Sequence, residues 1–218
     1  MKTISIIGAG LSGTLLAMNL LQKARKKAVN IKLIDRNPKE HLGPAYSTDE
    51  DYLLNVPVEI MGAFSADPAH FLKWTRSKSI SATEGDYMPR KLYRQYIHSM
   101  LKNALNNKYR QTKFERIQQD IIDVNRNINN SWILVTGKGK IETDKLVLAL
   151  GNSLPKNLKI KNTSFTNHTR YIRNPWKPDL LKKIHKFDNI LFIGSGQTMV
   201  DLATGLYKDK YKGKMTSI

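Results

Sequence analysis

The chain has 218 residues, with 36 Lys and Arg against 18 Asp and Glu, which gives a formal charge of +18 at pH 7. Its hydrophobic content of 40% is enough to build a core, which argues against a wholly disordered chain. The chain has no cysteine, which excludes disulfides, thiolate nucleophiles, cysteine-bound zinc and iron–sulfur clusters, so any redox chemistry would need an organic cofactor.

The composition also bears on location and partners. No apolar run approaches the roughly 18 residues of a membrane span, and residues 1–7 are too short for a signal peptide. We therefore expect a cytoplasmic protein without membrane contact. The lysines are spread along the chain without a nucleic-acid-binding signature, so we expect only non-specific attraction to polyanions and no specific nucleic-acid partner. The five histidines lack a metal-ligand spacing, so no metal site is predicted.

The first 35 residues read as a βαβ unit. Residues 3–7 form an apolar, β-branched run that predicts a buried strand, and glycines follow it at once. Apolar residues at helical spacing predict a helix from Leu11 to about Arg25, and residues 31–35 predict a second strand. Such a unit has parallel strands and a right-handed crossover.

After residue 35 the sequence predicts two helices, then several strands, and then a second βαβ unit. Asp67 is predicted to cap a helix that begins at Pro68, and a second helix is expected from Arg90 to Asn106. Residues 113–150 then alternate in the manner of strands, with runs over 114–124, 132–136 and 140–150. We interpret them as an antiparallel meander whose last run, 145–150, returns into a buried sheet. Residues 152–187 look like a crossover, after which a strand over 189–193, a helix over 197–207 and a strand over 214–218 begin a second βαβ unit.

The turn after the first strand fits the pattern GxGxxG between a strand and a helix, which favours a dinucleotide site. Gly8 permits the tight turn, Gly10 leaves room for a pyrophosphate, and Gly13 lets the helix pack closely. Asp35, at the end of the next strand, can accept hydrogen bonds from a ribose and disfavours NADP, an effect that Arg36 softens. The predicted residues are Gly8, Ala9, Gly10, Leu11, Ser12, Gly13, Asp35 and Arg36.

A second glycine turn, residues 194–199, departs from this pattern because Met199 stands where the third glycine would be. Two interpretations stay open. It is either a second dinucleotide site that uses Gly194, Gly196 and Gln197, or a strand-to-helix turn without a ligand.

Several segments together resemble one family. Residues 6–14 (IIGAGLSGT), 45–48 (AYST), 53–57 (LLNVP), 87–90 (YMPR), 146–151 (LVLALG), 174–176 (NPW) and 194–201 (GSGQTMVD) follow one another in its order. They are similar to the FAD/NAD(P)-binding family of large bacterial flavoproteins, which are oxidoreductases with two dinucleotide folds. In such flavoproteins the apolar strand ends in Ala-Thr-Gly, and this chain has Leu150 in place of the Thr.

The resemblance implies a fold and cofactors. It implies an α/β protein in which a Rossmann-like FAD-binding domain with a parallel sheet and an antiparallel meander precedes the start of a second Rossmann-like unit. FAD would lie at the first turn, with Ile122 near the adenine and Gly151 near the pyrophosphate. NAD(P)H would bind at the second turn, and Asn55 and Arg90, with Tyr46, would lie near the flavin. No catalytic acid or base is nominated, because the flavin would carry the chemistry.

The resemblance also implies an organisation and an activity. We expect an FAD-binding domain over 1–151, a crossover over 152–187 and a partial NAD(P)-binding unit over 188–218. Family members continue past the second turn, so the chain resembles a first half that lacks the C-terminal half, with a partner chain as one way to complete the second domain. The implied activity is that of an NAD(P)H-dependent oxidase or monooxygenase acting on an unknown small molecule. The alternatives are a non-catalytic dinucleotide-binding or interaction module and a dehydrogenase that uses NAD at the first turn alone.

Overall fold

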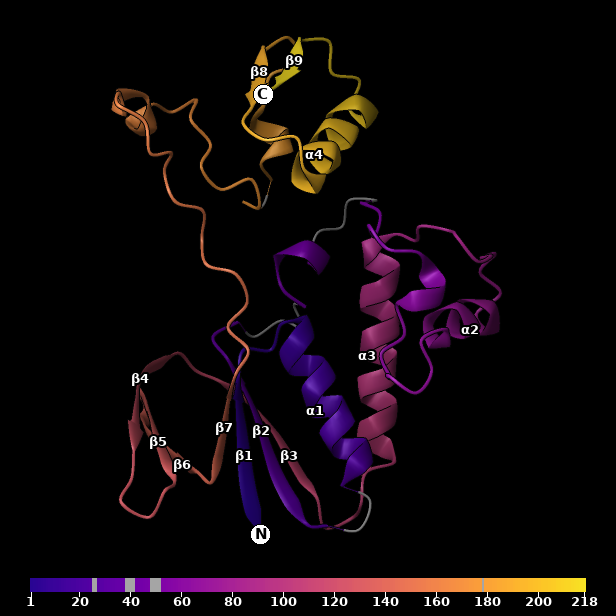
Figure 1. Ribbon diagram of the computed structural model, residues 1–218, viewed down its shortest axis with the longest axis vertical. Helices are drawn as coiled ribbons and strands as arrows, with labels where there is room; N and C mark the ends of the chain where they lie inside the picture. Colours follow the sequence, from indigo (N-terminus) through magenta and orange to yellow (C-terminus); the bar gives the residue numbers. More distant parts are fainter. Residues whose placement is uncertain (25–26, 38–41, 48–51, 178) are drawn as a thin grey trace.

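The computed structural model describes residues 1–24, 27–37, 42–47, 52–177 and 179–218. Its centre is a parallel sheet in the order β3-β2-β1-β7 (Figure 1). The strands are β1 (Lys2–Ile7), β2 (Val29–Asp35), β3 (Lys113–Gln118) and β7 (Lys145–Leu148). Because β1 and β2 run in parallel and in register from Lys2↔Val29 to Ile7↔Ile34, they end at the same edge of the sheet. The loops at that edge form the site described below.

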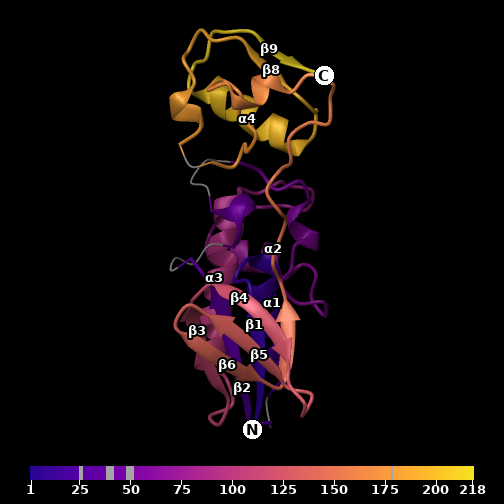
Figure 2. The same cartoon turned by 90° about the vertical axis from the view of Figure 1, so that its left-hand side faces the viewer.

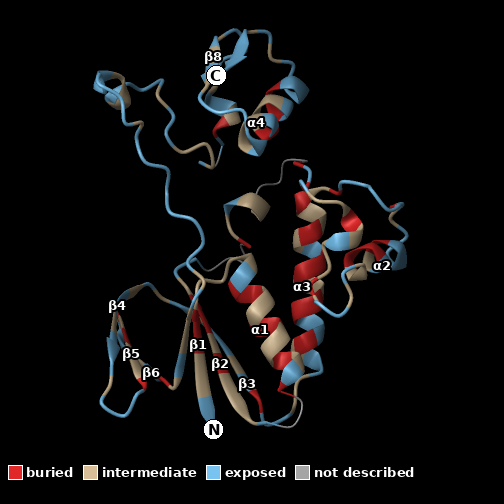
Figure 3. Ribbon diagram, in the orientation of Figure 1, coloured by how far each residue is buried: buried red, intermediate tan, exposed pale blue. Residues whose placement is uncertain are grey.

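Helices cover one face of this sheet. Helix α1 (Leu11–Lys23) and helix α3 (Arg90–Asn106) pack against each other over it, and α2 (His70–Ser77) lies on the outer side of α3. In α3 the buried residues recur three or four apart, which turns one stripe of the helix toward the core. The buried residues gather between α1, α3 and the sheet (Figure 3). Two single-turn helices, η1 (Pro44–Tyr46) and η2 (Val58–Ile60), stand in the loops near the ends of α1 and α3.

The opposite face of the sheet carries an antiparallel meander, as Figures 1 and 2 show from two sides. It consists of β4 (Ile121–Arg126), β5 (Trp132–Thr136) and β6 (Gly139–Thr143). The predicted strand over 114–124 was wrong in one respect, because it is two strands. Its first part, β3, pairs in parallel with β2 and extends the main sheet, and only the second part belongs to the meander.

The predicted start of the helix after residue 66 was also wrong. Helix α2 begins at His70, and neither Asp67 nor Pro68 caps it. The Pro68 carbonyl instead accepts the Gly62 N–H at 2.7 Å, which holds this segment against the 62–64 loop. The Asp67 carboxylate pairs with Lys73 at 2.8 Å. Helix α1 ends at Lys23, and the predicted end at Arg25 lies outside the described residues.

The C-terminal unit is a smaller βαβ unit, formed by β8 (Ile190–Phe192), α4 (Gln197–Lys208) and β9 (Met215–Ser217). Its two strands are parallel, as predicted. Residues 149–189 connect it to the N-terminal unit, and the helices found among the described residues of this range are the short η3 (Ser164–Asn167) and η4 (Leu181–Lys183). The whole is an α/β protein with a parallel sheet, an antiparallel meander and a smaller C-terminal βαβ unit, so the predicted fold class is confirmed. Within the described ranges, no helix has both the length and the apolar character needed to cross a membrane.

Candidate functional site

The first glycine turn joins the end of β1 to the start of α1. The Gly8 N–H donates to the Ile34 carbonyl at 2.8 Å, and its φ of +104° lies in the region that favours glycine. A Cβ at Gly8 would lie 2.2 Å from the Ala149 carbonyl oxygen, just beyond β7. One at Gly13 would lie 1.9 Å from the Gly8 carbonyl oxygen. Backbone packing therefore explains both glycines, because neither place has room for a side chain.

Gly10 differs from its two neighbours. It is the N-cap of α1, with φ −65° and ψ −174°, a conformation that any residue can adopt. A Cβ built there would meet only the Leu42 carbonyl oxygen, at 3.9 Å, which is ordinary contact. Nothing in the described protein therefore requires glycine at this position. Space beside the backbone at a helix N-terminus suits a phosphate, because the free N–H groups and the helix dipole attract anions.

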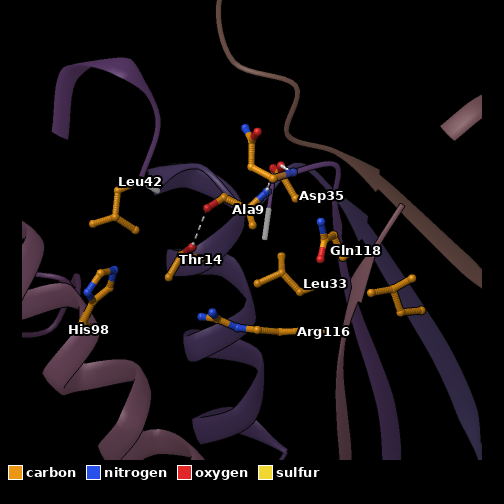
Figure 4. A pocket seen from close by; sticks show the side chains of 10 residues that line it. Ala9, Thr14, Leu33, Asp35, Leu42, His98, Arg116 and Gln118 are labelled. Atoms are coloured by element: carbon orange, nitrogen blue, oxygen red, sulfur yellow. Dashed lines mark hydrogen bonds between the residues drawn. The ribbon is translucent and has the colours of Figure 1, made fainter. Parts of the chain in front are cut away.

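Asp35 reaches this turn from the end of β2 (Figure 4). One carboxylate oxygen, Oδ2, accepts the Ala9 N–H at 2.7 Å, and the other, Oδ1, accepts the Asn37 N–H at 2.9 Å. A carboxylate has about four acceptor positions, so Asp35 can hold the turn and still accept bonds from a ligand hydroxyl.

A cavity of about 240 Å³ opens beside Asp35, between the turn, the sheet and α3. Strand β3 contributes Arg116, Ile117 and Gln118, and α3 contributes His98. The full lining is Ala9, Thr14, Leu33, Asp35, Asn37, Leu42, His98, Arg116, Ile117 and Gln118. Arg116 and His98 were not predicted from the sequence as site residues. Arg116 could have been predicted as a site residue if β3 had been assigned to the parallel sheet, beside the strand that carries Asp35.

The other residues predicted for the first site lie in different places. Leu11 donates its N–H to the Leu42 carbonyl at 3.0 Å, and Ser12 is exposed on the first turn of α1. Arg36 is exposed beside Asp35. Gly151 is exposed with φ +70°, two residues after the Ala149 carbonyl that contacts the turn. Ile122 is 69% exposed on β4 and is not among the cavity residues, whereas Ile117 and Gln118 of β3 are.

The second glycine turn repeats the backbone of the first. Gly194 has φ +104°, the value found at Gly8, and the N-cap Gly196 has φ −77° and ψ −175°. The Gly194 N–H donates to the Ile218 carbonyl at 2.9 Å, as Gly8 does to Ile34. Cβ atoms at Gly194 and Gly196 would meet nothing within 4 Å in the described structure, so the turn is open. Gln197, the first residue of α4, donates from its side chain to Asp201 Oδ1 at 3.0 Å.

The residues predicted near a flavin separate into two kinds. Asn55 is exposed in the loop before η2. Arg90 is buried at the start of α3, where Nε donates to the Leu53 carbonyl at 2.9 Å and Nη2 lies 2.8 Å from Asp201 Oδ2. Tyr46 contacts the Tyr93 ring with 5.6 Å between centroids. Burial raises the pKa of the Tyr46 phenol above its ordinary value, and the positive charge of Arg90 opposes that shift.

Comparison with known proteins identifies the family. Residues 5–153 match the model of the FAD-NAD(P)-binding family. The fold is similar to the closed crystal structure of cyclohexanone monooxygenase, with TM-score 0.58 and 14% identity over 100% of this chain. It is also similar to OTEMO in complex with FAD and NADP, with TM-score 0.64 and 14% identity over 99% of this chain.

This chain covers 38% of the length of each of those two structures. No curated protein sequence matches it. The family match spans the first glycine turn, Asp35, the cavity and the end of β7, and it confirms the class of cofactor predicted from the glycine pattern. The chain therefore belongs to the FAD-NAD(P)-binding family.

Proposed function

We propose that the N-terminal unit binds the ADP half of FAD. The adenosine would occupy the cavity between β2, β3 and α3, and the pyrophosphate would lie against Gly10 at the N-terminus of α1. The observation that carries the proposal is the pairing of an open Gly10 with a carboxylate that reaches the same turn, since Asp35 Oδ2 is 2.7 Å from the Ala9 nitrogen. A cavity of about 240 Å³ lies below the usual range of about 300–1,000 Å³ for ligand pockets, which suits a part of a dinucleotide.

Each of these residues would have a separate task. Asp35 would accept hydrogen bonds from the ribose, and its charge would repel a 2′-phosphate. The N–H groups of Ser12 and Gly13 would meet the pyrophosphate, because that of Leu11 is taken by Leu42. Ile117 and Gln118 would line the adenine side, in place of the contact expected from Ile122. Gly151 would lie beside the pyrophosphate, near the Ala149 carbonyl.

The second turn would bind NAD(P)H through the N-terminus of α4. Its support is the repeated geometry, since Gly194 and Gly196 reproduce the dihedral angles of Gly8 and Gly10. Ile218 stands in the register position of Ile34, because its carbonyl accepts the Gly194 N–H as that of Ile34 accepts the Gly8 N–H.

Together these assignments give an NAD(P)H-dependent flavoprotein oxidoreductase of the oxidase or monooxygenase type, acting on a small molecule in the cytoplasm. FAD would carry the electrons when bound, and the chain would bind and orient it. The same proposal divides the chain into an FAD-binding domain over 1–151, a crossover over 152–187 and a partial NAD(P)-binding unit over 188–218.

A second candidate function is a non-catalytic dinucleotide-binding or interaction module. It is favoured by exposed apolar side chains on the small C-terminal sheet, where Leu191 is 57% and Ile218 is 72% exposed. A partner chain that completes this unit would cover them. Under this candidate FAD binds, but NAD(P)H added without oxygen leaves the flavin oxidised. Bleaching of the flavin absorbance under the same conditions supports the oxidoreductase.

The test of the cofactor site compares ligands that share one half of FAD. We expect FAD and ADP to raise the melting temperature of ligand-free protein, because a ligand that binds only the folded state stabilises it by about 2.7 kcal/mol at one hundred times its Kd. FMN, which lacks the AMP portion, should have no such effect. Equal stabilisation by FMN, or none by FAD, contradicts the assignment. A tighter complex with NAD than with FAD would favour a dehydrogenase that uses the first turn alone.

A further inference from the structure

One buried ion pair joins the two units of the molecule. Arg90 begins α3 in the N-terminal unit, and Asp201 lies in α4 of the C-terminal unit. In Figure 1, α4 stands above the N-terminal end of α3. The side chains of Arg90 and Asp201 are 8% and 4% exposed, and Nη2 lies 2.8 Å from Oδ2. The other pairs recorded among the described residues have partners that are 31% to 79% exposed. Arg90 and Asp201 are therefore desolvated together, although α3 and α4 are far apart in the sequence.

Each partner is fixed on its own side. The Arg90 N–H donates to the Tyr52 carbonyl at 2.7 Å and its Nε to the Leu53 carbonyl at 2.9 Å, so the guanidinium cannot turn freely. Asp201 Oδ1 accepts the Gln197 side-chain amide at 3.0 Å. Since Gln197 follows Gly196, this bond connects the pair to the second glycine turn itself.

The segment between the units contributes one more contact. Trp176 places its ring 6.0 Å from the Arg90 guanidinium carbon, within the range of a cation–π contact. Most of residues 152–187 are exposed, and the only regular elements described there are η3 and η4. Trp176 is half-buried and adds a contact from this stretch to the ion pair.

The geometry indicates that the ion pair orients the two units and contributes little to the stability of the fold. The contact of Nη2 with Oδ2 has the distance of an ion pair but not the alignment of a hydrogen bond. Burying two charges costs desolvation energy that only excellent geometry repays, so such pairs add little net stability. Removing one partner is different, because the other charge is then left buried and unpaired. The unpaired charge regains water only if the two units separate.

We propose that Arg90 and Asp201 are positioning residues that hold the second glycine turn in a fixed orientation to the N-terminal unit. The importance of that orientation for hydride transfer rests on the proposed function. The fixed orientation itself does not depend on that function, because it concerns the two units of the ligand-free chain. Arg90, predicted to lie near the flavin, would then act through α4 without touching a cofactor.

The absence of cysteine makes a direct test straightforward. Cysteines introduced at Ser81 and Thr204, which are exposed on the N-terminal and the C-terminal unit, carry spin labels without background labelling. Electron–electron double resonance on the ligand-free protein then measures the distribution of distances between the units. We expect a single narrow peak, which Asp201→Asn and Arg90→Gln should each broaden. The double variant should be no broader than the broader single variant, because the two residues act as one pair.

Two further variants keep the test decisive. Asp179→Asn removes the same charge from an exposed pair with Lys182 in the C-terminal region and should leave the peak narrow. Trp176 lies outside the buried core, so Trp176→Leu remains a usable variant even if the charge variants fold poorly. It should also broaden the peak, because it removes the contact with Arg90. A broad distribution in the parent protein, additive broadening in the double variant or equal broadening by Asp179→Asn would overturn the proposal. FAD titration of the same variants should give unchanged affinity. If the parent protein does not bind FAD, that result counts against the proposed function alone.

Discussion

A Cβ atom at Gly10 would lie 3.9 Å from its nearest protein neighbour, whereas one at Gly13 would lie 1.9 Å from the Gly8 carbonyl oxygen. The two positions therefore separate ligand binding from folding. Gly10→Ala should change the free energy of unfolding by about 1 kcal/mol or less, as expected at a helix N-cap, and should abolish FAD binding because the methyl group fills the space for the pyrophosphate. Denaturation and FAD titration measure the two effects.

Gly13→Ala is the matched control for this prediction, because it should lower stability before any ligand is added. FAD affinity in Gly10→Ala equal to that of the parent protein would mean that the pyrophosphate lies elsewhere.

Asp35 combines two roles at the same residue, because its carboxylate accepts two backbone N–H groups of the protein and is the proposed partner of the ribose. Asp35→Ala leaves the Ala9 and Asn37 N–H groups without this acceptor. We expect the variant to lose about 1–3 kcal/mol of FAD binding energy, the range for charge-assisted bonds, and to melt at a lower temperature even without FAD. Calorimetric titration and thermal melting of the ligand-free protein separate these losses. An unchanged affinity would show that the ribose does not contact Asp35.

Tyr96 fixes helix α3 to the loop before α2. Its side chain is fully buried, and its hydroxyl oxygen accepts the Ala63 N–H at 2.9 Å and lies 2.9 Å from His70 Nδ1. Burial raises the pKa of the Tyr96 phenol to about 12. Because the folded-state pKa exceeds the ordinary value of 10.0, the contribution of Tyr96 is complete below pH 10 and is lost as the pH rises toward 12.

Tyr96→Phe should therefore lower the free energy of unfolding at pH 7 by about 1–3 kcal/mol, because the Ala63 N–H stays buried without its acceptor. The difference from the parent protein should shrink between about pH 10 and 12, where the parent loses the same contribution. Urea denaturation across this pH range measures both. The exposed Tyr87→Phe is the control and should have no effect. A difference that grows with pH would contradict this account of Tyr96.

The elements that were predicted well are those whose signals are local. Pro89 precedes α3 and fixes its first residue, and the glycine turn with Asp35 depends on residues within one βαβ unit. Strand β3 was assigned to the wrong sheet because its alternation is the same in either sheet, and only pairing with β2 decides. Arg116 and His98 could not be predicted for the same reason, since their place in the cavity depends on β3 and on the packing of α3. Asp67 was misassigned because its carboxylate pairs with Lys73 and the Pro68 carbonyl accepts the Gly62 N–H, so the helix begins only at His70.

The net charge of +18 has two opposite consequences for the protein. Like charges repel within the compact state and destabilise it, while the same excess of positive charge attracts an anionic dinucleotide. Salt screens both, since the Debye length falls from about 30 Å at 0.01 M to about 10 Å at 0.1 M. The ligand-free protein should therefore melt at a higher temperature as sodium chloride is raised over this range, while its affinity for FAD should fall.

Thermal melting and FAD titration in the same buffers measure these two slopes, and sucrose at matched osmolality is the uncharged control. Of the ion pairs recorded among the described residues, those of Lys2, Lys73 and Lys182 lie at the surface, where such pairs are worth at most about 1 kcal/mol. Their screening is too small to reverse the gain from reduced repulsion. A melting temperature that falls as salt is added would mean that these local pairs outweigh the net charge.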